Sequence, residues 1–466
     1  MIRFFNTLSR KLEPFRPLDP GKVKLYTCGP TVYDYAHIGN FRAYIFEDLL
    51  KRFLKFMDYE VIQVMNITDV DDKTIKGAQS EGLELEDYTK KYIQAFFEDL
   101  ESLNIDKADY YPRATEHILD MAKMITGLMN KGFAYRQDGS IYFRISKFPN
   151  YGRLSGMDLA KLKPGQRTEA DEYEKESVQD FALWKTKKEG EPFWETDIGA
   201  GRPGWHIECS VMSSKYLGQT FDIHCGGVDN IFPHHENEIA QSEAYSGKKF
   251  VNYWLHCRHL IVDGEKMSKS KGNQYTLREL LEKKHDPAAL RLLLLATHYR
   301  KMLNFTFAGL RQAEASLQRI RDFIYELENR KFKKEENKDI PKLVEKTRKK
   351  FIEGLSNDLN ISVSLTALFE MIRRVNINLA KEKLGPKNAE ELLSLIYSFD
   401  KVLALLPEKE KTSLSVDIEE KIKAREKARA EKNYELADKI RQELLESGVV
   451  LEDTKDGVRW KIKKSK

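Results

Sequence analysis

A strand, a glycine-bearing turn and a helix follow one another near the start of the chain, and this succession constrains the fold more than any other feature. Residues 23–28 (VKLYTC) form a short, largely apolar run that Gly29 and Pro30 interrupt. Apolar residues then recur at helical spacing over 41–57, and residues 60–67 have the pattern of a second strand. A strand, a crossover helix and a strand make a βαβ unit, so the sequence predicts a parallel sheet.

The rest of the chain divides by pattern and composition. Segments 133–136 and 141–145, joined by an Asp-Gly turn, predict a hairpin, and a charged stretch rich in Gly and Pro then runs to about residue 204. We interpret this part as an insertion between two halves of a nucleotide-binding domain. Further strands are expected at 221–224, 259–262, 449–451 and 458–460. Beyond residue 303 the pattern is almost wholly helical, and the highly charged stretch 330–350 is expected to be a solvated bridge.

The expected fold class is therefore α/β. A Rossmann-like nucleotide-binding domain, split by an insertion, is followed by a helical bundle and a small mixed α/β C-terminal unit. The expected boundaries are 1–113 and 204–303 for the two halves, 114–203 for the insertion, 304–406 for the bundle and 416–466 for the last unit.

Composition excludes several classes of protein. The 466 residues, 41% hydrophobic and 32% charged, fit a globular protein of two to four domains. A net charge of +5 permits a nucleic-acid partner without requiring one. No apolar run is long enough to cross a membrane, and the first residues lack the apolar core of a signal peptide, so a cytoplasmic location is expected. Four cysteines do not form a disulfide framework, which leaves metal binding, chemistry or packing as their roles.

Two short motifs carry groups that suit a triphosphate. The first, HIGN at 37–40, stands where a predicted strand feeds a helix, and open α/β sheets bind ligands there. Gly39 allows close approach of the backbone, and His37 can donate to a phosphate oxygen. The second, KMSKS at 266–270, places Lys266 and Lys269 three residues apart, which suits a loop that stabilises negative charge on phosphorus. Taken alone, His37 could equally cap a helix, and the lysines could lie in an exposed turn.

Four other residues could form a metal site: Cys28, Cys209, His234 and Glu238. His234 and Glu238 follow Pro233 and are four residues apart, which puts both on one helical face. Sulfur, nitrogen and oxygen donors in this mixture fit Zn²⁺ better than Ca²⁺ or Mg²⁺. Spacing alone leaves a packing role open for Cys28, and His235 is the nearest rival as a ligand.

Together, HIGN and KMSKS resemble the signature pair of class I aminoacyl-tRNA synthetases. GWHIEC at 204–209 and FPHHENE at 232–238 look like hallmarks of the cysteinyl-tRNA synthetase family, and the resemblance covers essentially the whole chain. The sequence departs from the commonest nucleotide motif once, because Asn40 replaces its second histidine. Since an amide can still donate to phosphate, we expect altered contacts rather than lost activity.

The resemblance implies ATP-dependent activation of L-cysteine and its transfer to tRNA(Cys), with ATP bound together with Mg²⁺. It also implies one Zn²⁺ per chain, held by the four residues named above, that selects the substrate thiolate over a serine hydroxyl. The implied roles are catalytic for His37, Lys266 and Lys269, and ATP-binding for these three with Gly39, Asn40, Asp229 and Ser268. The amino acid would lie near Thr31, Thr68, Trp205 and His206, and the tRNA near Arg459 and Trp460. A monomer without membrane contact is expected.

Two other functions stay open at this point. A cysteine ligase that acts on a small amine would share the catalytic half, but the long helical region after residue 303 argues against it. A non-catalytic, zinc-containing RNA-binding paralogue is favoured only by Asn40. For Trp460, stacking on an anticodon base and covering a small core both stay open.

Overall fold

The computed structural model describes residues 1–156, 180–268, 271–332, 335–406, 416–431, 433–447, 449–454 and 457–462. Lys269 and Ser270 of the KMSKS motif therefore lie outside the described residues. The chain divides into two compact units, one of Met1–Ile324 with Lys333–Leu405 and one of Tyr325–Phe332 with Leu406–Lys466. Among the helices of the described ranges, none has the length and apolar character needed to cross a membrane.

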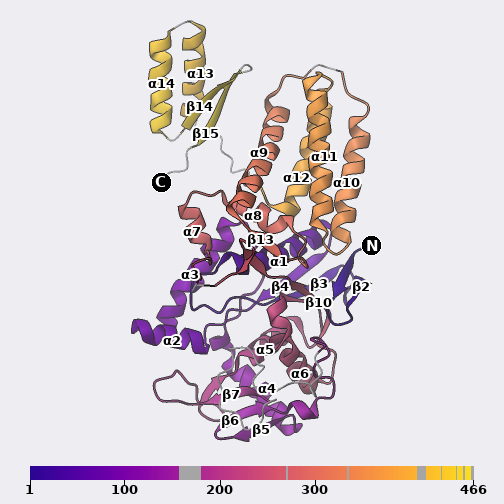
Figure 1. Ribbon diagram of the computed structural model, residues 1–466, viewed down its shortest axis with the longest axis vertical. Helices are drawn as coiled ribbons and strands as arrows, with labels where there is room; N and C mark the ends of the chain where they lie inside the picture. The colour runs from indigo at the N-terminus through magenta and orange to yellow at the C-terminus, as the bar shows by residue number, and fades with distance from the viewer. Residues whose placement is uncertain are drawn as a thin grey trace. The chain divides into compact units, whose positions relative to one another are not determined.

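A parallel sheet of four strands lies in the first unit (Figure 1). Its order is β10-β9-β3-β4, formed by β3 (Lys22–Thr27), β4 (Glu60–Met65), β9 (Phe221–Gly227) and β10 (Val251–Cys257). Helix α1 (Ile38–Phe56) connects β3 to β4, and α6 (His234–Ser246) connects β9 to β10. The predicted βαβ unit is confirmed, since β3 and β4 pair in parallel. The connections diverge between β3 and β9, which is where open α/β sheets bind ligands.

A second, antiparallel sheet lies in the sequence between β4 and β9. Its order is β5-β6-β7-β8, formed by β5 (Ala134–Gln137), β6 (Ser140–Phe143), β7 (Phe181–Thr186) and β8 (Gly201–Pro203). The hairpin predicted around 138–139 is confirmed. The same part of the chain contains α2 (Asp72–Glu81), α3 (Leu85–Ser102), α4 (Ile118–Asn130) and α5 (Trp205–Leu217). The split α/β fold expected from the sequence is thus confirmed, while its residue boundaries stay a prediction.

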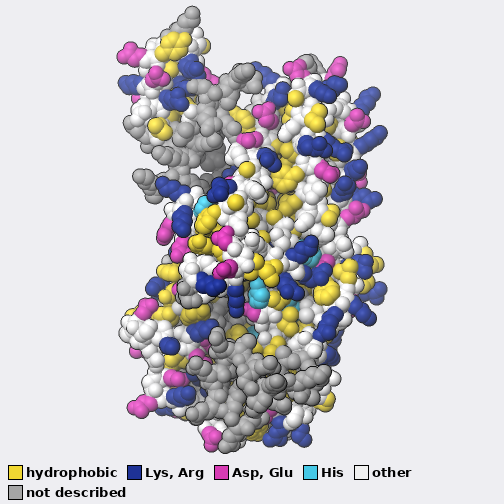
Figure 2. All heavy atoms as spheres, viewed as in Figure 1, with side chains coloured by type: hydrophobic (Ala, Val, Ile, Leu, Met, Phe, Trp, Pro, Cys, Tyr) yellow, Lys and Arg dark blue, Asp and Glu magenta, His cyan; other side chains and the backbone are white. Residues whose placement is uncertain are grey.

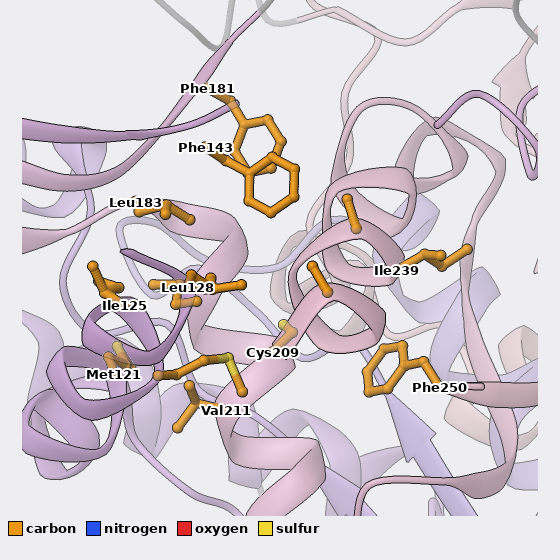
Figure 3. Close-up of a cluster of buried hydrophobic side chains, with 14 of the residues drawn as sticks. Met121, Ile125, Leu128, Phe143, Phe181, Leu183, Cys209, Val211, Ile239 and Phe250 are labelled. Carbon is orange, nitrogen blue, oxygen red and sulfur yellow. The ribbon is translucent and has the colours of Figure 1, made fainter. Parts of the chain in front are cut away.

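One hydrophobic core joins the antiparallel sheet to helices α4, α5 and α6 (Figure 3). Its members include Met121, Ile125, Leu128, Phe143, Phe181, Leu183, Val211, Ile239 and Phe250. Cys209 belongs to the same cluster and is 1% exposed. Because buried side chains pack at crystal-like density, this core holds α5 and α6 in place. Those two helices carry Cys209, His234 and Glu238.

The remaining elements complete the two units. A hairpin of β1 (Arg3–Asn6) and β2 (Lys11–Pro14) begins the chain. A small sheet of order β12-β11-β13 comprises β11 (Leu260–Val262), β12 (Glu265–Lys266) and β13 (Leu303–Phe305), with α7 (Leu277–Glu282) and α8 (Pro287–Ala296) between β12 and β13 in sequence. Helices α9 (Phe307–Asn329), α10 (Ile340–Ser356), α11 (Ile361–Ala380) and α12 (Pro386–Leu403) follow. The second unit contains α13 (Val416–Ala430), α14 (Tyr434–Glu446) and the predicted hairpin, β14 (Val449–Thr454) with β15 (Gly457–Ile462).

The prediction of a solvated bridge over 330–350 is wrong in its second half. Residues from 340 onward form α10, which packs against α11. Ile340, Phe351 and Leu355 are buried on one side of this helix, while Lys and Arg side chains gather on its exposed side (Figure 2). The high charge of the stretch concealed a narrow apolar stripe, which is enough to hold a helix in a bundle.

A buried ion pair connects helix α1 to α8 and to the end of α12. Arg291 of α8 is fully buried and pairs with Asp48 of α1, while its Nε donates to the Leu403 carbonyl at 2.7 Å. Nε of Arg52 lies 2.9 Å from the same Asp48 carboxylate. A buried charge is tolerated only with partners, so these groups hold α1, which begins within the HIGN motif, against α8 and the end of α12.

We expect Arg291→Met to lower the free energy of unfolding by about 3–5 kcal/mol, because Asp48 would lose a buried partner. Urea unfolding followed by far-ultraviolet circular dichroism measures this change. Lys22→Met is the control, since the Lys22–Glu60 pair spans 3.0 Å but its side chains are 54% and 57% exposed. The control should change stability by less than about 1 kcal/mol. Equal losses in the two variants would contradict the role assigned to Arg291.

Candidate active site

A cavity lies at the carboxyl ends of β3 and β9, and most of the residues selected from the sequence border it. Those residues are Cys28, Thr31, His37, Gly39, Asn40, Thr68, Trp205, Cys209, Asp229 and His234, together with Met267 of the KMSKS motif. They come from segments before and after the insertion. Two further residues, His206 and Glu238, are buried against His234. Lys266 is exposed at the end of β12, and Ser268 follows it.

His37 and Asn40 cap helix α1. Nδ1 of His37 accepts a hydrogen bond from the Asn40 N–H at 3.2 Å, and the Asn40 side chain accepts one from the His37 N–H at 3.1 Å. The helix-cap alternative for His37 is thus confirmed, and the reciprocal bonds form a capping box. Because Nδ1 accepts, the neutral ring carries its hydrogen on Nε2, which lets His37 cap the helix and still donate toward a phosphate.

The structure brings the HIGN and KMSKS motifs together. The Ile38 N–H donates to the Tyr275 carbonyl at 3.0 Å, and His37 forms a β-bridge with Thr276. A Cβ added to Gly39 would lie 2.7 Å from Cε of Met267, the end of a flexible side chain, so Gly39 and Met267 are in close contact. The start of α1, with the partial positive charge of a helix N-terminus, therefore lies next to the lysine-bearing segment.

The four proposed metal ligands also converge. The donor atoms of Cys28, Cys209, His234 and Glu238 all lie within 4.8 Å of one another. Nε2 of His234 is 3.1 Å from Oε1 of Glu238, so the two side chains share a face of α6 as predicted. A second group, Cys28, His224, His235 and Glu238, meets the same distance limit. The two groups share Cys28 and Glu238 and differ in their other two donors.

The protonation of these residues suits a bound cation. Burial lowers the pKa of His234 to about 3, so its ring is neutral and offers a lone pair. Burial raises the pKa of Glu238 to about 8, and no Lys or Arg of the described chain pairs with this carboxyl, whose Oε1 makes no hydrogen bond. A hydrogen bond with Cys209, together with burial, raises the pKa of the Cys28 thiol. A divalent cation would favour the ionised thiols and carboxylate, so the donor set fits Zn²⁺.

Other aromatic and imidazole rings position the ligand set. Nδ1 of His206 lies 2.8 Å from Nδ1 of His234, and Trp205 stacks on His234 with ring centroids 4.2 Å apart. The second ring nitrogen usually orients a metal-binding histidine, so His206 is placed to orient His234 rather than to border the cavity. Nε2 of His224 is 2.9 Å from Oε2 of Glu238, and Nε2 of His235 is 3.2 Å from Sγ of Cys28.

Sequence reasoning gave His224 no place at the site. The sequence places His224 in a predicted strand that ends at the cavity. Side chains alternate between the two faces of a strand, and the sequence alone does not tell which face lies toward the site. Glu47 on α1 was missed as well, although it borders the cavity. It lies seven residues after Asn40, which places both on one helical face.

The residues expected near the substrates lie in two places. Thr68 donates its hydroxyl hydrogen to Oε2 of Glu208 at 2.8 Å, and Thr31 and Thr68 form a parallel β-bridge. The Asp229 side chain is 67% exposed, with Oδ1 3.9 Å from Nδ1 of His259. In the second unit, the backbone register of the terminal hairpin places residue Arg459 opposite Glu452 and Trp460 opposite Leu451. Contact of these two residues with RNA stays a prediction.

Family comparisons cover most of the chain. Residues 14–315 match the family of class I (C) tRNA synthetase catalytic domains, 350–407 match the DALR domain, and 411–460 match the cysteinyl-tRNA ligase anticodon binding domain. Among solved structures, the chain resembles Mycobacterium tuberculosis methionyl-tRNA synthetase in complex with methionyl-adenylate. That match has a TM-score of 0.60 and 15% identity over 82% of this chain and 90% of the other, and it shows the fold alone.

Curated relatives match over almost their whole length. The cysteine–tRNA ligase of Protochlamydia amoebophila is 50% identical over 99% of this chain and 98% of its own. That of Brachyspira hyodysenteriae is 50% identical over 99% of both chains, and that of Chlamydia muridarum is 51% identical over 98% of both. Identity at this level over both chains leaves no part of the fold unmatched, and the chain therefore belongs to the cysteine–tRNA ligase family of class I tRNA synthetases.

Proposed function

We propose that this protein activates L-cysteine with ATP and transfers the cysteinyl group to the 3′-terminal ribose of tRNA(Cys). One observation carries the proposal: two thiols and an imidazole of the candidate metal cluster border a single cavity together with residues of the HIGN and KMSKS motifs. The relatives named above are cysteine–tRNA ligases, and their similarity extends through the anticodon binding domain. Neither a ligase for small amines nor a non-catalytic paralogue is favoured by these matches.

In the first step the cysteine carboxylate attacks the α-phosphorus of ATP, and pyrophosphate leaves as the α–β phosphoanhydride bond breaks. Negative charge builds on the phosphate oxygens during this in-line displacement. His37 would donate from Nε2, and the positive end of α1 would face the same oxygens. Lys266 and Lys269 would neutralise charge on the triphosphate, and the hydroxyl of Ser268 would donate to it. In the second step a ribose hydroxyl of the tRNA attacks the carbonyl carbon, and AMP leaves. Neither step needs a nucleophile from the protein.

Cys28, Cys209, His234 and Glu238 would hold one Zn²⁺. Bound there, the ion would favour a substrate thiolate over a neutral hydroxyl. Through a directly engaged polar group, a site can discriminate by a factor of about 10⁴, which removes the need for a separate editing site. Trp205 would orient the ring of His234 on one side, and His206 would hold its Nδ1. Thr31 and Thr68 would lie beside the amino acid.

Pyrophosphate exchange with each of the twenty amino acids tests the proposed function. We expect exchange that depends on cysteine, because only a thiol can use the metal site, followed by charging of total tRNA with cysteine. Exchange without charging would instead support the ligase for small amines. Absence of exchange with every amino acid would support the non-catalytic paralogue.

Two single substitutions distinguish the overlapping ligand groups. We expect purified His234→Ala to contain far less than one zinc per chain, because a direct donor is removed. His235→Ala should retain the metal with affinity weaker by about 10–100-fold, the usual effect of a residue that contacts a ligand. Mass spectrometry of the metal content measures both, with His259→Ala, outside both groups and 55% exposed in its side chain, as the control. If His235→Ala loses the metal and His234→Ala retains it, the metal site is instead the second group, which contains His224 and His235.

The terminal hairpin has its own test. If Trp460 stacks on an unpaired base, Trp460→Ala should raise the KM for tRNA by a factor that corresponds to about 1–3 kcal/mol. Arg459→Ala should weaken binding in a salt-dependent way, since a phosphate contact is lost. Pyrophosphate exchange should be unchanged in both, because it needs no RNA. Lys439→Ala on α14 serves as the exposed control, and an unchanged KM in the Trp460 variant would remove this residue from the RNA contact.

A further inference from the structure

Glu47 of helix α1 is a buried acidic side chain with no hydrogen-bonding partner in the described chain. It is 1% exposed, and neither carboxylate oxygen makes a hydrogen bond. Other buried acids near the cavity have at least one partner. Asp48 accepts from Arg52 and Arg291, and Glu208 accepts from Thr68. A native protein seldom buries such a group unless something else satisfies it.

The position of Glu47 links it to the cavity. Asn40, Ala43 and Glu47 follow one another at spacings of three and four along α1, so they share one face, and all three border the cavity. Cys257, which ends β10, borders it too. Sγ of Cys257 donates to the Arg42 carbonyl at 3.7 Å, so the end of β10 lies against α1.

The cavity wall tells which part of a ligand would meet Glu47. Of the proposed metal ligands, Cys28 follows β3, while Cys209 lies on α5 and His234 and Glu238 lie on α6. The two threonines follow β3 and β4, and the amino acid is expected beside these residues. Phosphates are expected at the start of α1 and at Met267, whereas Glu47 lies seven residues beyond Asn40, about 10 Å further along the helix. Gly227 and Asp229, near the end of β9, and Cys257, at the end of β10, also border the cavity and belong neither to the proposed metal ligands nor to the HIGN and KMSKS motifs. A nucleoside has hydrogen-bond donors to offer there.

We propose that Glu47 is a nucleoside-binding residue, which accepts a hydrogen bond from the adenosine part of ATP. The inference rests on the proposed function only for the identity of the nucleotide. The donor is either the exocyclic amine of the base or a ribose hydroxyl, and both have the same chemistry toward a carboxyl oxygen. Burial raises the pKa of Glu47 well above its usual range, so the free protein holds it as a neutral acid. A neutral acid can meet a nucleoside without the cost of burying a charge.

Glu47→Leu tests the proposal because it keeps the bulk and removes both oxygens. We expect the KM for ATP in pyrophosphate exchange to rise about tenfold, which corresponds to about 1.4 kcal/mol, while the KM for cysteine stays within twofold. The melting temperature should rise or stay constant, because an unsatisfied buried group is removed. Glu47→Gln keeps a donor and an acceptor of similar shape and should recover most of the ATP affinity.

Analogues identify the donor. Purine riboside triphosphate lacks the amine, and 2′-deoxy-ATP and 3′-deoxy-ATP each lack one hydroxyl. The wild-type protein should bind one of the three analogues about tenfold more weakly than ATP. The Glu47→Leu variant should bind that same analogue as well as it binds ATP. If the effect of the Glu47→Leu substitution and the effect of the missing group multiply for all three analogues, the two act independently, and this result would overturn the proposal. So would an unchanged KM for ATP, or a lower melting temperature with equal losses for ATP and cysteine.

A control variant and a binding measurement test the role of Glu47 independently of the proposed function. Asp99→Asn is the matched control, because Asp99 of α3 is a buried acid with one unbonded oxygen that does not border the cavity. It should leave the KM for ATP unchanged. Calorimetric titration of ATP into the wild-type and Glu47→Leu proteins needs no amino acid. If cysteine-dependent exchange fails in the wild type, the proposed function fails, and a tenfold difference in the Kd for ATP still supports the role of Glu47.

Discussion

The neighbouring positions of β3 and β9 in the parallel sheet decide where everything else in the site lies. Because strands from the two halves of the domain pair there, Cys28 at the end of β3 and the Gly226–Asp229 segment at the end of β9 come together across about 200 residues of sequence. Helix α1 follows one strand and α6 follows the other, so both helices begin at the same edge of the sheet. The core around α4, α5 and α6 then holds Cys209 and His234 against that edge.

Local patterns predicted the parts of the structure that depend on neighbours in sequence. The alternation and turn residues around the first strand predicted the βαβ unit, and the spacing of His234 and Glu238 predicted their shared face. The helix-cap alternative for His37 followed from its place before an apolar helix. The pairing of HIGN with KMSKS came from resemblance, and the structure adds the contact itself, the Ile38 to Tyr275 bond and the approach of Gly39 to Met267.

What sequence could not predict depends on contacts distant in the chain. Strand β10 was missed because Asn252 and His256 interrupt its apolar pattern, although β9 pairs with it along its length. His224 could be a core histidine or a neighbour of the metal ligands until Glu238 is placed beside it. Glu47 has the sequence signature of an exposed helical residue, since glutamate favours helices and usually faces water. Its burial follows only from the packing of α1 on the sheet.

Buried acidic and basic groups in this protein differ in whether the protein itself satisfies them. Asp48, Arg52 and Arg291 satisfy one another, so the protein gains a fixed helix and needs nothing from outside. Glu47 has no hydrogen bond, and Glu208 and Glu238 each keep an oxygen without one. A fold selected for stability alone would replace such groups with apolar residues. Of these three, Glu47 borders the cavity, and an unsatisfied group there is what a binding site requires, because groups already satisfied within the protein have nothing left to offer a ligand.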